Sequence, residues 1–428
     1  MQKIIIISYF SYPCNLTAAR RVDGWAKYLN LYGYYPVIIS RNWENKIKIP
    51  ADVLEPSGTS LIHEKHQNYE IFYLPHKGTL RNWTYSKFKN TPFKFLFKML
   101  TFSGLILENF FIKAVSFINI YNFSRSYLKQ NPEINKVIIS GNPFIQFKFG
   151  YLLKKEFNIS WIADYRDDWN TSEINSNQGL LQKTISKLQQ KSEKKWVSSA
   201  SCITSVSTHY VKKISEFVHK PGYVLLNGFD ESDISTPNIH TKEDEFIITY
   251  NGTLYPTQPI ELFLKAIKKV ITIHKDAKIK LQFPGLAFDK LQEARVKNCM
   301  KGFEEHLLIT ERLAHEKVID LQKQSHLLLM IAHENIKGIP SSKLYEYIGL
   351  KKPILLCPSD KDIIENTLND TGLGIICKSE EDVVKEIGAL ILKHKQKLPL
   401  ISNPDENRID SYSRKNQAFK LSEILDLI

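Results

Sequence analysis

The segment Gly338–Pro358, GIPSSKLYEYIGLKKPILLCP, decides how the chain is interpreted. Pro340 closes a loop, and one of the two serines that follow it begins a helix, because an N-cap hydroxyl accepts a hydrogen bond from an otherwise unpaired backbone N–H. The helix is expected to end near Gly349 and to be followed by a short apolar strand, Pro353–Cys357. A loop, a helix and a buried strand in this order are typical of an α/β domain.

Two charged side chains of this helix suit a binding site. Lys343 and Glu346 are three residues apart and share one face near the helix N-terminus, whereas Leu344, Tyr347 and Ile348 lie largely on the other face. Free N–H groups, the helix dipole and an ammonium group all favour an anion such as a diphosphate. A glutamate one turn further on can accept hydrogen bonds from two sugar hydroxyls. The combination predicts a nucleotide-sugar site; the alternative is a solvated ion pair on an ordinary helix.

Strand-like apolar runs alternate with helical stretches and fall into two series. Runs rich in Ile, Val and Leu that are separated by helices predict parallel strands covered on both faces. The polar stretch Asn227–Asp244 separates the series and is interpreted as an interdomain linker. We therefore expect an α/β fold of two doubly wound, Rossmann-like domains, residues 1–230 and 245–410, that face a central cleft with ligands at the carboxyl ends of the strands. The expected strands are Lys3–Ser8, Tyr35–Ser40, Glu70–Leu74, Lys136–Ser140, Ile159–Asp164, Cys202–Val206 and Tyr223–Leu226, then Phe246–Asn251, Lys278–Pro284, His306–Thr310, His326–Ala332, Pro353–Cys357 and Leu373–Cys377.

The loop and helix after the first strand, SYFSYPCNLTAARRVDGW, contain an unusual pair of cations. Arg20 and Arg21 fall in the first helical turn, where the helix dipole disfavours positive charge. Arg20 is therefore a candidate contact for an acceptor phosphate or for the donor diphosphate. The alternative is a surface ion pair with Asp23. The loop has no G-x-G-x-x-G pattern, which argues against a nicotinamide cofactor.

A second cluster ends another strand of the first domain. In WIADYRDDW, the ionisable residues Asp164, Arg166, Asp167 and Asp168 follow the apolar run, which indicates a functional site or a buried salt-bridge cluster. We predict that Asp164 and Arg166 face the cleft and hold the acceptor or the transferred sugar, and that Asp167 orders the loop. The spacing does not make an Asp-x-Asp metal motif.

These segments resemble those of family-four glycosyltransferases, which are retaining enzymes of the GT-B fold. The segment at Gly338 is similar to the nucleotide-sugar-binding signature of the family, and the strand ending at Asp164 is similar to its bacterial cell-surface-polysaccharide members. Further similar segments occur in the same order over nearly the whole chain: SGNPFIQFKFGYLLKKEF (140–157), LLNGFDESD (225–233), YNGTLYP (250–256), LITERLAHEKVIDL (308–321) and a C-terminal helix, 413–428, that is expected to pack back onto the first domain.

The resemblance implies a role for each matching residue. Glu346 would contact the nucleotide ribose, Lys343 would lie by the diphosphate, and Gly252 would let the backbone approach it. The implied catalytic residues are Asp164, Arg166 and Lys343. The implied donor-binding residues are Gly252, Thr253, Leu313, Ala314, Gly338, Ile339, Pro340, Ser341, Ser342, Lys343, Leu344 and Glu346, with Leu313 and Ala314 at the base; Asn15, Arg20 and Asn142 are expected on the acceptor side.

Two departures from the pattern of the family bear on the donor. Many relatives carry an arginine and a lysine after the residue that matches Gly252, but Thr253–Pro259 (TLYPTQP) contains no cation. Lys343, with Arg20, would then have to neutralise the diphosphate. The family also often has a second glutamate where this chain has Gly338, so backbone N–H groups of Gly338–Ser341 are expected to contact the hexose.

The composition of the chain indicates which kinds of molecule it can bind. The chain has 428 residues and a formal net charge of +13, which favours an anionic partner such as a phosphorylated substrate or a membrane surface. No nucleic-acid-binding motif is recognisable, and five scattered cysteines are interpreted as reduced core residues. Residues 91–129 interleave aromatic and aliphatic side chains with lysine, which is typical of a helix lying in a membrane interface. The alternative for this segment is two core helices.

The sequence therefore predicts a metal-independent, retaining hexosyltransferase without a cofactor, whose donor is a UDP- or GDP-linked sugar. The expected acceptor is lipid-linked or a polysaccharide, as in capsule or lipopolysaccharide synthesis in bacteria. The expected location is cytoplasmic, peripheral on the inner face of the plasma membrane. A sugar-nucleotide epimerase of the same fold and a non-catalytic scaffold of a polysaccharide assembly complex remain alternatives. The donor sugar, the acceptor and the oligomeric state are left open.

Overall fold

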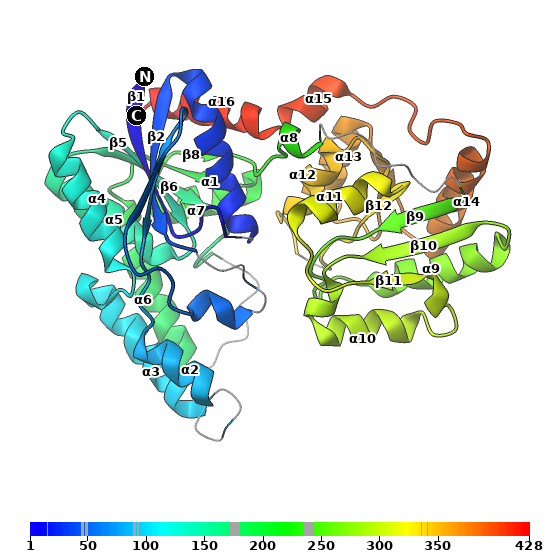
Figure 1. Ribbon diagram of the computed structural model, residues 1–428, viewed down its shortest axis with the longest axis horizontal. Coiled ribbons are helices and arrows are strands. Elements are labelled where there is room, and N and C mark those ends of the chain that lie inside the picture. Colours follow the sequence, from blue (N-terminus) through cyan, green and yellow to red (C-terminus); the bar gives the residue numbers. More distant parts are fainter. Residues whose placement is uncertain are drawn as a thin grey trace. The chain divides into compact units, whose positions relative to one another are not determined.

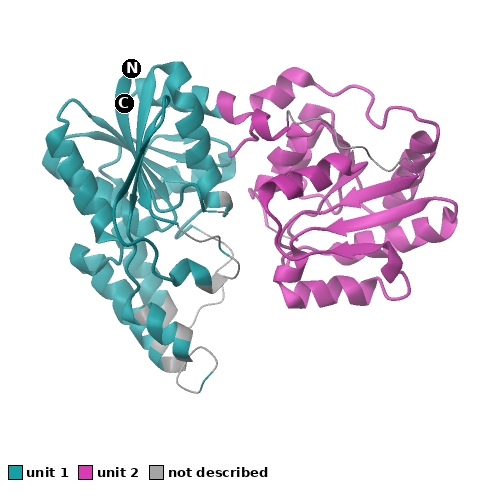
Figure 2. Cartoon of the chain, in the orientation of Figure 1, with its two compact units in different colours: residues 1–226, 417–428 teal, residues 227–416 magenta. Residues whose placement is uncertain are grey.

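The computed structural model describes residues 1–14, 16–43, 47, 50–88, 91, 94–171, 180–234, 244–334, 336–339 and 341–428. They form two compact units (Figure 2). Unit 1 comprises Met1–Leu226 together with Gln417–Ile428, and unit 2 comprises Asn227–Asn416. The five cysteines are free, and all are buried except the half-buried Cys299.

Unit 1 is built on an eight-stranded sheet with helices on both faces (Figure 1). The strand order is β3-β4-β2-β1-β5-β6-β7-β8, and every described pairing is parallel except β3 with β4. The strands are β1 (Gln2–Ser8), β2 (Tyr34–Arg41), β3 (Ile62–Lys65), β4 (Glu70–Leu74), β5 (Lys136–Gly141), β6 (Ser160–Tyr165), β7 (Cys202–Ser205) and β8 (Gly222–Val224). The helices are α1 (Thr17–Tyr28), α2 (Leu80–Phe88), α3 (Lys94–Phe110), α4 (Ile118–Gln130), α5 (Phe147–Phe157), α6 (Leu180–Val197) and α7 (Thr208–Val218).

The central strands of unit 1 lie where uninterrupted apolar runs predict them. Ile4–Ile7 of β1 have no exposed surface, because helices cover both faces of a parallel sheet. The antiparallel edge strand β3 was not predicted: all four of its residues are exposed, so it carries no apolar run.

The last helix, α16 (Arg414–Asp426), completes the core of unit 1. From Gln417 onwards it belongs to this unit. Its apolar face packs with side chains of β1 and α1 in one hydrophobic cluster. Polar contacts also hold it: Gln417 accepts a hydrogen bond from Leu226 N at 2.8 Å, and Tyr34 of β2 donates one to Asp426. The buried apolar residues of the helix are Ala418, Leu421, Ile424 and Leu425.

The aromatic segment 91–129 divides into an exposed helix and a core helix. α2 and α3 lie side by side (Figure 1), and Met99, Phe110 and Phe111 expose 63%, 64% and 63% of their surface. After Phe111 the side chains turn inward: Val115, Phe117, Ile120 and Leu128 are buried, which corrects the expectation of an interfacial face over the second half of the segment. No described helix is both long and apolar enough to cross a bilayer.

Unit 2 has a parallel sheet in the order β11-β10-β9-β12-β13-β14. Helices pack on both of its faces (Figure 1). The strands are β9 (Glu245–Thr249), β10 (Lys278–Phe283), β11 (Leu307–Ile309), β12 (Leu327–Met330), β13 (Ile354–Leu356) and β14 (Gly374–Ile376). The helices are α8 (Glu231–Ile234), α9 (Ile260–Ile273), α10 (Lys290–Cys299), α11 (His315–Gln324), α12 (Ser342–Gly349), α13 (Ile363–Thr371), α14 (Glu380–Lys395) and α15 (Glu406–Ser411).

The stretch expected to be a linker is structured over its first residues. It carries the short helix α8, and Phe229 exchanges backbone hydrogen bonds with Tyr412 O and Arg414 N at 3.1 and 2.7 Å. Residues 235–243 of the stretch lie outside the described part of the chain.

Candidate functional site

The loop that follows β9 is organised by one buried glutamine. Gln258 Nε2 donates a hydrogen bond of 2.6 Å to Ile331 O, which ties the loop to the end of β12. Its Oε1 lies 3.0 Å from Tyr255 N and 3.1 Å from the Tyr250 hydroxyl. The loop 250–258 is therefore held in one conformation at the carboxyl edge of the sheet of unit 2.

Two glycines leave open space at this edge. Gly252 has φ +84°, and a Cβ added there would meet no atom within 4 Å. A Cβ added to Gly285 would lie 3.8 Å from the Cα of Gly252, so the loops after β9 and β10 are neighbours. Gly285 N also donates a hydrogen bond to Thr310 O at 3.2 Å, which brings in the loop after β11. Glycine backbone at two adjacent strand ends, β9 and β10, is suited to close approach by a diphosphate.

Lys343 extends from α12 over this loop. Its ammonium group lies 3.9 Å from the centroid of the Tyr250 ring and 3.4 Å from Thr253 O. Burial lowers the pKa of Lys343 to about 7, and the negative charge of Glu346 opposes this shift. The structure therefore brings Lys343 to Thr253, next to Gly252, with Glu346 of the same helix close enough to act on the charge of Lys343. That these residues bind a donor stays a prediction.

The start of α12 differs in detail from the prediction. Ser341 is the N-cap residue, but its side chain makes no capping hydrogen bond. Leu344 is corrected from donor-binding to core, because its side chain is fully buried and its N–H bonds to Ser341 O at 3.0 Å. The N–H of Gly338, expected to contact the hexose, donates to Asp362 Oδ2 at 2.7 Å instead.

The remaining donor-side residues occupy loops at the same sheet edge. Ser342 begins α12 and Ile339 lies in the loop before it. Leu313 and Ala314 follow β11, with Ala314 as the N-cap of α11. Pro340 lies outside the described residues.

His333 is a residue of this site that the sequence analysis missed. It follows β12, and its Nδ1 lies 2.7 Å from Thr257 Oγ1. Burial and the charge of Lys343 lower the pKa of His333. A lone histidine has no spacing pattern, so only the structure identifies it.

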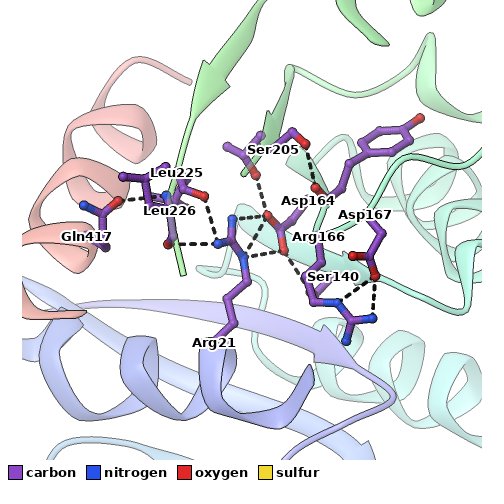
Figure 3. Close-up of polar contacts among 11 residues, drawn as sticks. Arg21, Ser140, Asp164, Arg166, Asp167, Ser205, Leu225, Leu226 and Gln417 are labelled. Atoms are coloured by element: carbon purple, nitrogen blue, oxygen red, sulfur yellow. Dashed lines mark hydrogen bonds and ion pairs between the residues drawn. The ribbon is translucent and has the colours of Figure 1, made fainter. Parts of the chain in front are cut away.

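In unit 1, Asp164 forms a buried ion pair with Arg21 (Figure 3). Arg21 Nη2 lies 2.7 Å from Asp164 Oδ1, and both side chains are almost fully excluded from solvent, with 1% and 0% exposed. Ser140 and Thr204 donate to the carboxylate at 2.8 Å each. Arg21 Nη1 also donates to the carbonyls of Leu225 and Leu226 at 2.9 and 3.0 Å.

This network corrects the predicted role of Asp164. Its carboxylate is fully buried and accepts hydrogen bonds from side chains of α1, β5 and β7. Asp164 therefore holds these elements together at the carboxyl ends of the strands and does not face a ligand. Of the two arginines of α1, it is Arg21 that turns inward, while Arg20 is half-buried.

Two of the other acceptor-side candidates, Arg166 and Asn142, follow the neighbouring strands β6 and β5. Arg166 follows β6 and donates to Asp167 Oδ2 at 3.0 and 2.6 Å (Figure 3), in accord with a loop-ordering role for Asp167. Asn142 follows β5 and is exposed. Asn15 lies outside the described residues.

The chain has two sheets of mostly parallel strands, each covered by helices. This architecture defines it as a protein of the GT-B fold. No protein-family model and no curated protein matches the chain. Among solved structures, the chain is similar to sucrose-phosphate synthase from Thermosynechococcus elongatus, with TM-score 0.64 and 13% identity, covering 100% of this chain and 99% of that one. It is similar to Anabaena HepE in complex with UDP and glucose, with TM-score 0.59, 10% identity and 100% of both chains covered. It is also similar to a protein from Listeria monocytogenes assigned as a UDP-N-acetylglucosamine 2-epimerase, with TM-score 0.52, 12% identity, and 98% and 95% of the two chains covered.

Proposed function

We propose that the chain is a retaining glycosyltransferase that transfers a sugar from a nucleotide diphosphate donor bound by unit 2 to an acceptor bound by unit 1. The observation that carries the proposal is the grouping of Lys343 and Glu346 beside the side-chain-free backbone of Gly252 and Gly285. The UDP and glucose of HepE, a protein of the same fold, support a UDP-linked sugar as the first donor to test, with a GDP-linked sugar as the second.

In the proposed reaction the acceptor hydroxyl attacks the same face of the sugar from which the diphosphate leaves. The leaving phosphate accepts the proton of that hydroxyl, so no protein nucleophile is needed. The protein supplies positioning and stabilises the charge that develops on the departing phosphate. Lys343 is placed for the second task, and Arg166 is the candidate for holding the acceptor. We propose that the reaction requires neither a metal ion nor a cofactor.

A thermal-shift screen tests donor binding, because a ligand that binds only the folded state raises its melting temperature. UDP-glucose, UDP-N-acetylglucosamine, GDP-mannose, CMP-sialic acid and dTDP-glucose form the panel. We expect one nucleotide class to raise the transition in a concentration-dependent manner, and Glu346→Ala to reduce the shift at the same ligand concentration. If no member of the panel shifts the transition, the proposed function is wrong.

Product analysis separates the proposal from two other functions. The Listeria structure shows that the same fold is found in a protein assigned as an epimerase. Incubation with UDP-N-acetylglucosamine alone would yield an epimer in that case. A non-catalytic scaffold would release no nucleotide with any acceptor, whereas a transferase releases the nucleotide diphosphate only when an acceptor is present.

We further propose that the acceptor is lipid-linked or a polysaccharide and that the protein lies on the inner face of the plasma membrane, as in capsule or lipopolysaccharide synthesis. The exposed apolar side chains of α2 and α3 support this proposal. Trp83 is half-exposed, and the Lys87 ammonium lies 4.6 Å from its ring. Tryptophan beside a cation is typical of side chains at a membrane surface. Lys148 of α5 donates to the carbonyls of Glu108 and Asn109 at 2.9 and 2.8 Å, which fixes the end of α3 to the body of unit 1.

Sedimentation with vesicles of phosphatidylglycerol and phosphatidylcholine tests membrane binding. Since the side chains of Phe95 and Phe97 lie outside the described residues, the variant to use is Met99→Gln, Phe110→Gln and Phe111→Gln. We expect it to remain folded, because these side chains are exposed, and to stay in the supernatant at low salt. A matched triple replacement of exposed leucines of unit 2 should sediment like wild type; the control is Leu291→Gln, Leu392→Gln and Leu398→Gln. Wild-type protein that never sediments would overturn the proposal.

A further inference from the structure

The loop 250–258 that follows β9, called the donor loop below, contains no cation. A basic side chain from the segment after β12 nevertheless lies against it. His333 Nδ1 is 2.7 Å from Thr257 Oγ1, and its ring centroid is 5.4 Å from that of Tyr255. Glu334 N donates a hydrogen bond of 2.8 Å to Thr257 O, so the segment after β12 is fastened to the donor loop. Within the described part of the chain, Nε2 of His333 has no hydrogen-bond partner and is the ring nitrogen that a ligand could reach.

Lys343 approaches the same loop from α12. Its ammonium lies over the Tyr250 ring and near Thr253 O, and the carboxylate that acts on it electrostatically is that of Glu346, on its own helix. Three tyrosines lie around the two basic groups: Tyr250 under Lys343, Tyr255 beside His333, and Tyr347, whose hydroxyl accepts a hydrogen bond from Asn251 N. Tyr250 and Tyr347 have raised pKa values because they are buried, and they are neutral at physiological pH.

Both basic groups are disfavoured from carrying charge in the empty site. Burial and the charge of Lys343 lower the pKa of His333, and burial lowers the pKa of Lys343 to about 7. An anion within about 4–6 Å reverses both effects, because it stabilises the protonated form of each group. A permanent cation such as arginine would not respond in this way.

We propose that His333 and Lys343 together neutralise the diphosphate of the donor, and that they take up protons from solvent when this anion binds. The proposal rests on the proposed function and adds to it a second donor-binding side chain and a proton linkage. It explains how the site accommodates a diphosphate although Thr253–Pro259 supplies no cation.

The linkage has a definite sign. With a pKa of about 7, Lys343 is mostly charged in the empty site at pH 6 and mostly neutral at pH 8. The diphosphate diester of UDP-glucose keeps its charge over this range. Affinity for UDP-glucose should therefore fall about tenfold between pH 6 and pH 8, with uptake of about one proton per ligand bound at pH 8.

Isothermal titration calorimetry measures both quantities. UDP-glucose, GDP-mannose and dTDP-glucose are titrated at pH 6 and at pH 8, at each pH in two buffers whose ionisation enthalpies differ, such as HEPES and Tris at pH 8. The difference in heat between the two buffers gives the protons taken up. We expect proton uptake for wild type. Lys343→Arg should bind without proton uptake at pH 8, because arginine is already charged. His333→Asn should weaken binding and reduce proton uptake near pH 6, while retaining a polar group opposite Thr257.

A second half-buried lysine of unit 2 is the matched control. Lys352 precedes β13 at the opposite edge of the sheet, and burial lowers its pKa to about 8. Lys352→Met should leave both affinity and proton uptake unchanged. Binding that is independent of pH and buffer would overturn the inference and leave the proposed function standing. Unaltered affinity and proton uptake in His333→Asn would remove His333 from the pair. Failure of all three sugar nucleotides to bind would overturn the proposed function itself.

Discussion

Replacing either partner of the buried ion pair of Arg21 and Asp164 should destabilise unit 1 strongly. Asp164→Asn removes the carboxylate that pairs with the Arg21 guanidinium, and Arg21→Met removes the cation from a carboxylate that also accepts from the hydroxyls of Ser140 and Thr204. Because each change breaks a buried ion pair by removing one of its partners, we expect a loss of about 3–5 kcal/mol in the free energy of unfolding for either variant. The double variant removes both charges and should therefore cost clearly less than the sum of the two single variants.

Tryptophan fluorescence reports this loss for unit 1 alone, because all six tryptophans of the chain lie in Met1–Leu226. Urea unfolding of wild type, the two single variants and the double variant completes a double-mutant cycle. Glu156→Gln, which breaks the exposed ion pair with Arg125 in the same unit, is the control and should have a far smaller effect. Costs below about 1 kcal/mol for both single variants would refute the reasoning, because the pair would then contribute no more than an exposed one.

Three further outcomes can be checked. Glu346→Ala should weaken nucleotide-sugar binding by about 1–3 kcal/mol in calorimetry, the cost of an unmade charged hydrogen bond, and unchanged affinity would exclude the ribose contact. Gly252→Ala should cost unit 2 about 1–2 kcal/mol in the free energy of unfolding, because alanine is strained at φ +84° even though no atom lies within 4 Å of the new Cβ, and it should lower donor affinity. Burial raises the pKa of Glu193, which bonds Tyr165 and Asn170, to about 7. The free energy of unfolding is therefore higher at low pH, and about 3 kcal/mol of it is lost as the pH rises through 7. Glu193→Gln should remove this loss in urea unfolding at pH 8.

Most of the sheet architecture follows from sequence because a parallel strand buried on both faces needs a continuous apolar run. Each predicted run corresponds to an observed strand, and no strand end differs from its prediction by more than two residues. The strand β3 could not be predicted in this way, because it lies at the edge of the sheet and all four of its residues are exposed. β3 is held by backbone hydrogen bonds to β4, and these leave no pattern of apolar side chains in the sequence.

The site was predictable to the extent that its residues lie close together in sequence. Lys343 and Glu346 share one helix turn, and Gly252 follows a strand, so local rules place them. Which of two adjacent arginines turns inward is decided by Asp164, 143 residues away from Arg21. Similarly, His333 acquires its significance only from contact with the loop at Thr257. Such choices depend on tertiary packing, which a single sequence does not display.

The closing of unit 1 by α16 has a consequence for biosynthesis. Leu421 and Leu425 belong to the same core as Ile4 and Ile6, so the core around β1 is complete only after the much later helix α16 has been synthesised. Unit 2 is continuous in sequence over Asn227–Asn416 and needs no later segment, so we expect it to fold first during synthesis. The emerging N-terminal half must meanwhile carry an incomplete core with an open apolar groove, and it is the part of the nascent chain that most needs a chaperone.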